Sequence, residues 1–248
     1  KVIVRPGVGY DLIDVAACRA NDIQVCYLPD YCVDEVADHA VALLMAVERK
    51  LWQHQRNCQA GVWNDQQPGP IRRLNTLTLG LIGLGKIGRR FVAKMREIIP
   101  TVIAYDPYLP DAMFAQANAK KVSLDELYQN ADVIAIFAPL TTENRRIISA
   151  DSIKKMVRHP IIVNVSRGGQ VDTVDLIAGL KSGAISGAGL DVLDTEPKIN
   201  PELTQLDNVV LTPHAGWFSV ESETENRTRT AQEIIRVIRG EPPRNPVP

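Results

Sequence analysis

The fold is decided by one stretch of the sequence, Leu79-Gly80-Leu81-Ile82-Gly83-Leu84-Gly85-Lys86-Ile87-Gly88. It contains the spacing G-x-G-x-x-G, which occurs by chance in many proteins and is informative only in context. Here an apolar segment precedes the glycines, and apolar residues follow them at helical spacing, namely Ile87, Phe91, Met95 and Ile98. A strand, a glycine turn and a helix in this order are typical of a dinucleotide-binding βα unit.

Each part of the turn has a separate task in this interpretation. Gly83 allows the tight turn after the strand, Gly85 lets a pyrophosphate approach bare backbone, and Gly88 allows the helix to pack closely on the sheet. Lys86 and Ile87 begin the helix, where backbone N–H groups and the helix dipole attract phosphate. We therefore predict that these five residues bind the cofactor.

Asp106 narrows the choice of cofactor. It stands directly after the next apolar segment, Thr101–Tyr105. A carboxylate at this position can accept hydrogen bonds from both hydroxyls of the adenosine ribose. The same negative charge would repel the 2′-phosphate of NADP, so the sequence predicts NAD.

Short apolar segments alternate with helical patterns along the chain, as in a parallel sheet covered by helices on both faces. The segments are Val2–Val4, Leu79–Gly83, Thr101–Tyr105, Asp132–Phe137, Ile161–Val165, Ser186–Val192 and Val209–Thr212. Six of them follow residue 78, which is enough for a complete doubly wound α/β sheet of the Rossmann type. We expect helices over Asp34–Asn57, over Asp172–Gly183, and from a capping serine at Ser222 to Gly240.

Composition argues against several other classes of protein. The 248 residues carry 28 basic and 29 acidic side chains, and the resulting net charge of −1 argues against a nucleic-acid partner. No apolar run approaches the roughly 20 residues that span a membrane. The four cysteines show no C-x-x-C spacing, so we expect no metal site and reduced thiols in the cytoplasm.

Candidate catalytic residues follow the later strands. Of the four histidines, only His214 lies directly beyond an apolar segment, where open α/β sheets bind their ligands. Arg167 and Glu196 stand at equivalent positions after two other segments. Spacing alone leaves two interpretations open: three unrelated surface residues, or one group that converges at the carboxyl edge of the sheet.

Nearly the whole chain, from Val4 to Gly240, resembles the D-isomer-specific 2-hydroxyacid dehydrogenase family. Besides the glycine turn, the resemblance rests on motifs in the family's order: Val8-Gly9-Tyr10-Asp11, Glu35-Val36-Ala37-Asp38-His39, Tyr105-Asp106-Pro107, Pro139-Leu140-Thr141, Ser166-Arg167-Gly168-Gly169, Gly189-Leu190-Asp191-Val192, Glu196-Pro197 and Pro213-His214-Ala215. Within the family the chain is most similar to the C-terminal-binding-protein branch, because of Arg5, Tyr105–Leu109 and His214–Ser219.

The resemblance implies an NAD-dependent enzyme that interconverts a 2-keto acid and a D-2-hydroxy acid. His214 would be the acid and base of the reaction, Glu196 would hold its imidazole, and Arg167 would bind the substrate. The resemblance adds three cofactor contacts, which are Pro139, Ser166 and Asp191. It also implies four substrate contacts, which are Arg5, Val8, Gly9 and Trp217.

The resemblance also implies a domain organisation. Residues 1–32 would be the remnant of a flavodoxin-like substrate domain whose earlier part is missing. Residues 33–217 would form the NAD-binding domain with its hinge helix, and residues 218–248 a helix that returns to the substrate domain. The long first helix and the segment around Trp52 and Trp63 predict a homodimer.

The substrate stays open within this interpretation. A 3-phosphoglycerate dehydrogenase and a glyoxylate or hydroxypyruvate reductase both fit, whereas Glu196 disfavours the formate dehydrogenases, which carry glutamine there. The alternative from another class is an NAD(H)-responsive interaction protein of the corepressor type with weak dehydrogenase activity. Corepressors of that branch keep the same arginine, glutamate and histidine, so these residues do not separate the two functions.

Overall fold

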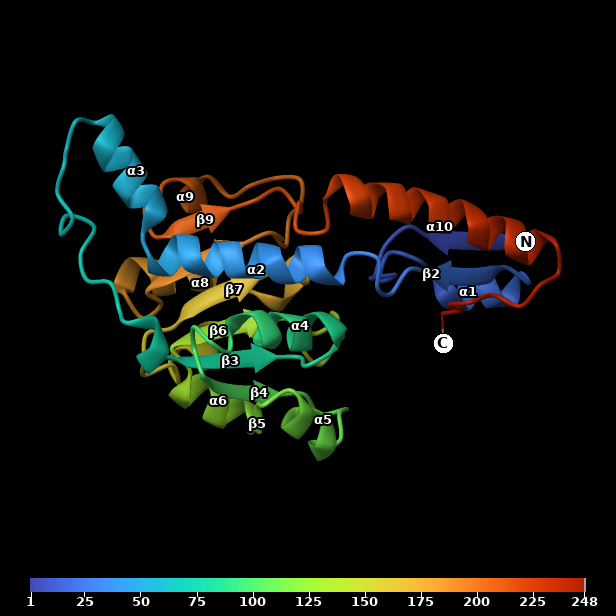
Figure 1. Ribbon diagram of the computed structural model, residues 1–248, viewed down its shortest axis with the longest axis horizontal. Coiled ribbons are helices and arrows are strands. Elements are labelled where there is room, and N and C mark those ends of the chain that lie inside the picture. Colours follow the sequence, from blue (N-terminus) through green and yellow to red (C-terminus); the bar gives the residue numbers. More distant parts are fainter. Residues whose placement is uncertain (248) are drawn as a thin grey trace. The chain divides into compact units, whose positions relative to one another are not determined.

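The computed structural model describes residues 1–247 and divides into two compact units (Figure 1). Unit 1 consists of Lys1–Glu35 and Trp217–Pro248, and unit 2 of Val36–Gly216. The chain therefore leaves unit 1 once and returns to it once. Each unit has its own sheet.

Unit 2 is built on a seven-stranded parallel sheet in the order β5-β4-β3-β6-β7-β8-β9. Its strands are β3 (Thr78–Ile82), β4 (Thr101–Tyr105), β5 (Lys120–Lys121), β6 (Val133–Ile136), β7 (Ile161–Asn164), β8 (Gly187–Leu190) and β9 (Val209–Leu211). The order reverses at β3, which is the topological switch point of a doubly wound sheet. The predicted α/β Rossmann fold is confirmed, with the glycine turn at the carboxyl end of β3.

Helices cover both faces of this sheet (Figure 1). The helices between Val33 and Thr204 are α2 (Val33–Glu48), α3 (Leu51–Gln59), which stands away from the sheet, α4 (Lys86–Met95), α5 (Asp111–Gln116), α6 (Leu124–Asn130), α7 (Ala150–Ile153), α8 (Thr173–Ser182) and α9 (Pro201–Thr204), with 3-10 turns η1 (Leu74–Thr76) and η2 (Gly168–Gln170). Successive residues of β8 face opposite sides of the sheet, and each side is covered by a different helix. Ala188 packs in one apolar cluster with Leu176 of α8, whereas a Cβ on Gly189 would lie 2.9 Å from Leu43 of α2.

The predicted single helix over Asp34–Asn57 is wrong, because the chain forms two helices there. α2 ends at Glu48 and α3 begins at Leu51, and Lys50 between them has a φ of 52°. The Lys50 ammonium donates a hydrogen bond to the carbonyl of Pro68, so the residue between the two helices is held by a residue 18 positions further along the chain. The helix predicted over Asp172–Gly183 is confirmed as α8, with Asp172 as its N-cap.

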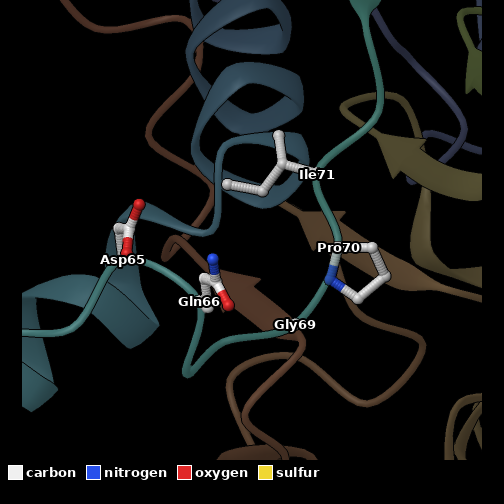
Figure 2. A pocket seen from close by; sticks show the side chains of 5 residues that line it. All are labelled: Asp65, Gln66, Gly69, Pro70 and Ile71. Carbon is white, nitrogen blue, oxygen red and sulfur yellow. The ribbon is translucent and has the colours of Figure 1, made fainter.

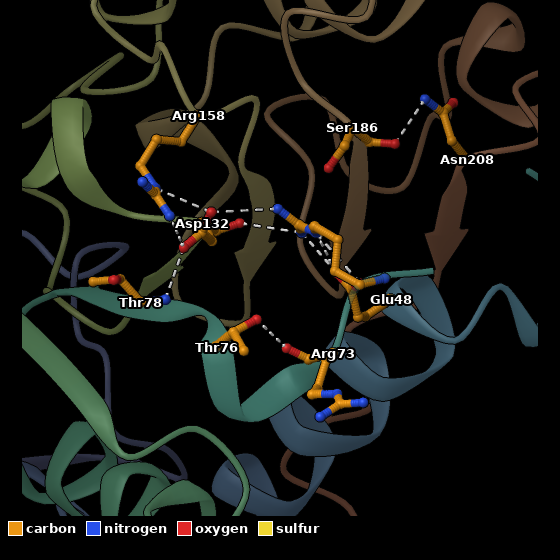
Figure 3. A network of polar contacts seen from close by, with 9 residues as sticks. Glu48, Arg73, Thr76, Thr78, Asp132, Arg158, Ser186 and Asn208 are labelled. Atoms are coloured by element: carbon orange, nitrogen blue, oxygen red, sulfur yellow. Dashed lines mark hydrogen bonds and ion pairs between the residues drawn. The ribbon is translucent and has the colours of Figure 1, made fainter. Parts of the chain in front are cut away.

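A charge network around two buried carboxylates, Asp132 and Glu48, lies at the amino-terminal edge of the sheet (Figure 3). The Asp132 carboxylate, only 5% exposed, accepts a hydrogen bond from the Thr78 backbone N–H at 2.8 Å. Arg158 donates to both of its oxygens, and Arg72 joins it to buried Glu48. The network ties the start of β3 to the end of α2, at the edge of the sheet opposite the glycine turn.

Unit 1 contains a two-stranded parallel sheet of β1 (Val2–Arg5) and β2 (Gln24–Tyr27), with α1 (Val15–Ala20) and α10 (Val220–Ile238). The strand predicted at Val2–Val4 is confirmed, but β2 was not predicted. The capping serine of α10 is Ser219, not Ser222, since the Ser219 side chain accepts from the Ser222 N–H. Ser222 is buried and its side chain accepts from the Ser219 N–H.

The buried face of α10 carries polar side chains. Glu233 is 3% exposed and accepts a hydrogen bond from the Arg244 backbone N–H at 2.7 Å. Burial, together with the nearby Glu233 carboxylate, raises the pKa of the Cys26 thiol to about 11. Cys26 is therefore an unreactive thiol at neutral pH.

Candidate functional site

The glycine turn after β3 has the close packing that its sequence predicts. Gly83 has a φ of 91°, and a Cβ there would lie 2.5 Å from the Ala138 nitrogen. A Cβ on Gly88 would lie 2.7 Å from the Gly83 carbonyl oxygen, because α4 crosses directly over the turn. Both positions therefore require glycine.

Gly85 differs from the other two glycines. A Cβ there would meet no heavy atom within 4 Å, so the space over the turn is open. Gly85 is also the N-cap of α4, and its lack of a side chain leaves the amide groups of the first turn without a capping group. Open space at the start of α4, where no side chain caps the backbone amides of Lys86 and Ile87, fits a dinucleotide pyrophosphate.

The Asp106 carboxylate lies beside this turn. Its Oδ2 accepts a hydrogen bond from the Leu84 N–H at 2.9 Å, and its Oδ1 accepts one from the Tyr108 N–H at 3.1 Å. A carboxylate has about four lone-pair positions, so each oxygen can accept another donor. The side chain is therefore held in place and still able to bind hydroxyl groups.

Pro139 and Ser166 lie on the loops that follow β6, which pairs with β3, and β7, which pairs with β6. The Ser166 hydroxyl donates to the Ala138 carbonyl at 2.6 Å, so the two loops are joined. Gln170 is fully buried and donates to the same carbonyl at 3.0 Å. Gln170 was not predicted from the sequence, because a glutamine after two glycines carries no signal by itself.

His214 and Glu196 form a hydrogen-bonded pair beyond the carboxyl ends of β9 and β8. The His214 Nδ1 lies 2.9 Å from the Glu196 Oε2, and both side chains are partly exposed. The other Glu196 oxygen accepts the Leu193 N–H at 2.9 Å, which fixes the plane of the carboxylate. With Nδ1 bound to the carboxylate, the Nε2 atom of His214 is the nitrogen available to a ligand.

Arg167 lies in the loop after β7 and is the N-cap residue of the 3-10 turn η2. Its Nη1 donates to the Ser166 carbonyl at 2.8 Å, and buried Asn164 donates to the Arg167 carbonyl at 2.9 Å. A Cβ on Gly168, the next residue, would lie 1.9 Å from the Leu193 carbonyl carbon. The loop of Arg167 therefore packs against the loop that carries Glu196.

Asp191 lies at the end of β8 and is 3% exposed. Its carboxylate accepts hydrogen bonds from the Thr212 hydroxyl at 2.6 Å and from the backbone of Ala215 at 2.8 Å and Gly216 at 2.9 Å. Burial alone would raise the pKa of this carboxyl. Hydrogen bonds from the side chains of His39 and Thr212 and from the two backbone amides outweigh burial, so the pKa lies below its ordinary value.

The residues predicted to contact substrate belong to unit 1. Arg5 donates from Nε to the Gly9 carbonyl at 3.2 Å, which folds the segment containing Val8 over the arginine. Trp217 lies against Tyr31, with ring centroids 6.4 Å apart, and against Phe218 at 5.5 Å. Their substrate roles remain predictions.

A pocket lies on the segment between α3 and β3, lined by Asp65, Gln66, Gly69, Pro70 and Ile71 (Figure 2). None of the predicted site residues lines it. Among residues 1–247, no group of three or more His, Cys, Asp or Glu side chains could hold a metal ion. No helix in the same range is long and apolar enough to cross a membrane.

Comparison with known proteins assigns the chain to a family. Residues 41–216 match the NAD binding domain of the D-isomer specific 2-hydroxyacid dehydrogenases. A D-3-phosphoglycerate dehydrogenase of Methanocaldococcus jannaschii is 40% identical over 243 residues, which are 97% of this chain and 46% of that protein. A glyoxylate reductase of Pyrococcus horikoshii is 34% identical over 249 residues, which are 98% of this chain and 75% of that protein.

A solved structure agrees with these matches. It is a D-lactate dehydrogenase of Aquifex aeolicus complexed with NAD and lactic acid, with a TM-score of 0.89 and 29% identity, and the match covers 97% of this chain and 77% of that one. The chain therefore belongs to the D-isomer specific 2-hydroxyacid dehydrogenase family, and its Rossmann unit is the family's NAD-binding domain. The chain spans about half the length of the phosphoglycerate dehydrogenases that it matches.

Proposed function

We propose that this chain carries the catalytic machinery of an NAD-dependent dehydrogenase that interconverts a 2-keto acid and a D-2-hydroxy acid. The observation that carries the proposal is the His214–Glu196 hydrogen bond of 2.9 Å. This imidazole–carboxylate pair lies at the carboxyl edge of the same sheet whose glycine turn fits the dinucleotide. An acid–base pair at that edge is what a cofactor that transfers hydride needs beside it.

NADH, when bound, supplies a hydride to the carbonyl carbon of the keto acid. His214 then protonates the carbonyl oxygen from Nε2 and takes the proton back in the oxidative direction. Glu196 accepts the Nδ1–H of the imidazole, which keeps the ring in one orientation and stabilises its charged form. The Leu193 N–H holds the second Glu196 oxygen, so the pair is already in place before substrate arrives.

Arg167 would bind the substrate through its guanidinium group. A planar fork of donors suits a carboxylate and an adjacent keto oxygen, anchoring the one and polarising the other. The fixed backbone supports this role, because the Asn164 amide holds the Arg167 carbonyl. The position of the loop also supports this role. Gly168, next to Arg167, packs on Leu193 in the loop that carries Glu196, so Arg167 would bind substrate at the same site as the His214–Glu196 pair.

The cofactor contacts proposed for this chain follow the turn and the neighbouring loops. Gly83, Gly85, Lys86, Ile87 and Gly88 would hold the pyrophosphate, and Asp106 the adenosine ribose. Pro139 and Ser166 would line the groove. Asp191 would hold the nicotinamide carboxamide, and the single hydrogen bond at its Oδ2 supports this role by leaving that oxygen a lone pair.

The substrate is tested with a panel of keto acids. The relatives are named for phosphoglycerate and glyoxylate, so the panel contains phosphohydroxypyruvate and glyoxylate, with hydroxypyruvate, pyruvate and phenylpyruvate as further members. Oxidation of NADH is followed by its absorbance with the complete natural protein. Preference for one acid confirms the proposal, whereas NADH binding without turnover on any acid contradicts it and favours a cofactor-sensing interaction protein.

The role of His214 is tested by His214→Gln. Because glutamine keeps polarity but cannot transfer a proton at neutral pH, kcat is expected to fall by about 10²- to 10⁴-fold. The NADH dissociation constant, measured by fluorescence, is expected to stay unchanged, since His214 is assigned to the proton and not to the cofactor. Loss of both activity and NADH binding would show that His214 has a structural role instead.

A further inference from the structure

We infer that His39 is a positioning residue for His214, acting through Thr212 and Asp191. The inference rests on the proposed function, since it concerns the acid–base residue named there. His39 lies on α2, far in sequence from the loop it contacts, and it is not among the site residues predicted from the sequence. Its contacts, all within unit 2, indicate a specific role.

The backbone at His214 needs outside support. His214 has a φ of 55°, in the left-handed region that is unfavourable for residues with a side chain. Its N–H donates to the Asp191 carbonyl at 2.8 Å and to the Thr212 carbonyl at 3.0 Å. The direction of the imidazole therefore depends on how firmly the surrounding loop is held.

Asp191 holds the loop on both sides of His214. Its carboxylate binds the Thr212 hydroxyl before the histidine and the Ala215 and Gly216 amides after it. Its backbone carbonyl accepts the His214 N–H as well, so Asp191 makes four hydrogen bonds to the segment from Thr212 to Gly216. A change in the orientation of this carboxylate would therefore move the His214 backbone.

His39 supplies the remaining donor to this cluster. Its Nε2 lies 2.8 Å from the Thr212 hydroxyl oxygen and 3.3 Å from the Asp191 Oδ1. The Thr212 hydroxyl has a single proton, which it gives to Asp191, because two oxygens 2.6 Å apart need a proton between them. His39 must therefore donate its Nε2–H to the Thr212 oxygen, which fixes the tautomer of the ring.

The ring of His39 also fills the space beneath the loop. A Cβ on Gly216 would lie 3.3 Å from the His39 Cδ2 and 2.9 Å from the Asp191 Oδ2. The Asp191 side chain is only 2% exposed, and the His39 side chain is 22% exposed. Without the imidazole, the Thr212 hydroxyl, which binds the buried Asp191 carboxylate, would lose its donor. The loop would also lose a packing surface, and with it its fixed position.

Two substitutions of His39 separate the donor from the rest of the side chain. His39→Leu removes the N–H, whereas His39→Gln keeps a donor near the position of Nε2. Because a small misplacement of a reacting group costs a large factor in rate, His39→Leu is expected to lower kcat by about 10- to 100-fold. We expect His39→Gln to recover most of this loss, and the KM for keto acid to change by less than about threefold in both variants.

His54→Leu is the matched control, because it removes a histidine from α3, outside this cluster, and is expected to leave kcat unchanged. Thr212→Val and Thr212→Ser test the same path with a second pair. Valine removes the hydroxyl and is expected to behave like His39→Leu, whereas serine keeps it and is expected to stay close to the natural chain. If His39→Leu does not fold, the two Thr212 variants still test whether the path from His39 to His214 affects kcat.

The ring resonances of His214 in NMR spectra give a readout that does not depend on turnover. They are expected to shift in His39→Leu and Thr212→Val and to stay in place in His39→Gln and Thr212→Ser. Equal kcat and unchanged resonances in all variants would overturn the inference, as would equal losses in the leucine and glutamine variants. If the natural protein shows no turnover on any keto acid, the proposed function fails, while the resonances still test the positioning role.

Discussion

Asp106 is the single residue on which selectivity between NAD and NADP is expected to depend. Its two backbone hydrogen bonds hold a negative charge beside the glycine turn. Asp106→Asn keeps an acceptor for the Leu84 N–H but removes the charge that repels a 2′-phosphate. We expect the preference for NADH over NADPH, measured as the ratio of kcat/KM values, to narrow by at least about tenfold. An unchanged ratio would remove the role assigned to Asp106.

Asp191 is expected to make the stability of the protein depend on pH in the acid range. Its pKa in the folded chain is below the ordinary value of 3.8, so the unfolded chain takes up this proton first as the pH falls. The stabilisation is therefore complete at neutral pH and is lost as the pH falls through the folded-state pKa. Asp191→Asn removes this contribution.

The measurement is urea unfolding of both proteins between about pH 7 and about pH 3. The difference in free energy of unfolding between the natural chain and Asp191→Asn is expected to be largest at neutral pH and to shrink toward acid. Asp151→Asn is the control, because the Asp151 carboxylate is exposed and its ion pair with Lys154 lies on the surface, where solvent screens it. A difference for Asp191→Asn that stays constant with pH would contradict the prediction.

Single residues were only partly predictable from the sequence. The His214–Glu196 pair could be named because motifs in the family's order contain both residues, although spacing alone left open whether the two lie together. His39 and Thr212 could not be joined in the same way, since 173 positions separate them and a hydrogen bond between them leaves no pattern in sequence. The residues that hold the acid–base pair are found only through packing.

At the scale of elements, the buried charge network at the start of β3 is expected to stabilise the sheet. Asp132→Ala leaves the Thr78 N–H without its acceptor and removes the partner of Arg158. Because Asp132 is buried and its removal leaves the Thr78 N–H without an acceptor, we expect the free energy of unfolding to fall by about 2 kcal/mol. Chemical unfolding measures this, with Asp151→Ala as an exposed control that is expected to cause no measurable change. Similar effects in both variants would show that the network contributes nothing beyond a surface ion pair.

Helices and strands were predicted correctly where the hydrophobic pattern was long, and the predictions were wrong where the local signals were ambiguous. Six apolar segments became the six longer strands of the unit 2 sheet, whereas β5 consists of two exposed lysines and has no apolar signal. The break between α2 and α3 was missed because apolar residues continue at helical spacing across Lys50 and neither Gly nor Pro marks the site. The start of α10 was misplaced because Ser219 and Ser222 both fit a capping position.

At the scale of the whole molecule, we propose that the protein is a homodimer formed through α3 and the segment after it. Figure 1 shows α3 and this segment standing away from the sheet of unit 2. Large apolar side chains are exposed there: Leu51 is 55%, Trp52 50% and Trp63 93% exposed. Exposed aromatic side chains gathered on one projecting segment are typical of an interface that a partner covers.

A second copy of the chain is the expected partner, because closed two-fold dimers are the commonest assembly of soluble proteins. Light scattering at about 10 µM is expected to give twice the chain mass of 27.4 kDa. Trp52→Arg combined with Trp63→Arg places two charges in the interface and is expected to give a folded monomer. Val157→Arg is the control, since Val157 is also exposed but lies outside the segment. A monomer in the natural protein would contradict the proposed dimer. A dimer that survives the double substitution would show that these side chains do not form the interface, because burying two arginines without partners would be too unfavourable for the dimer to form.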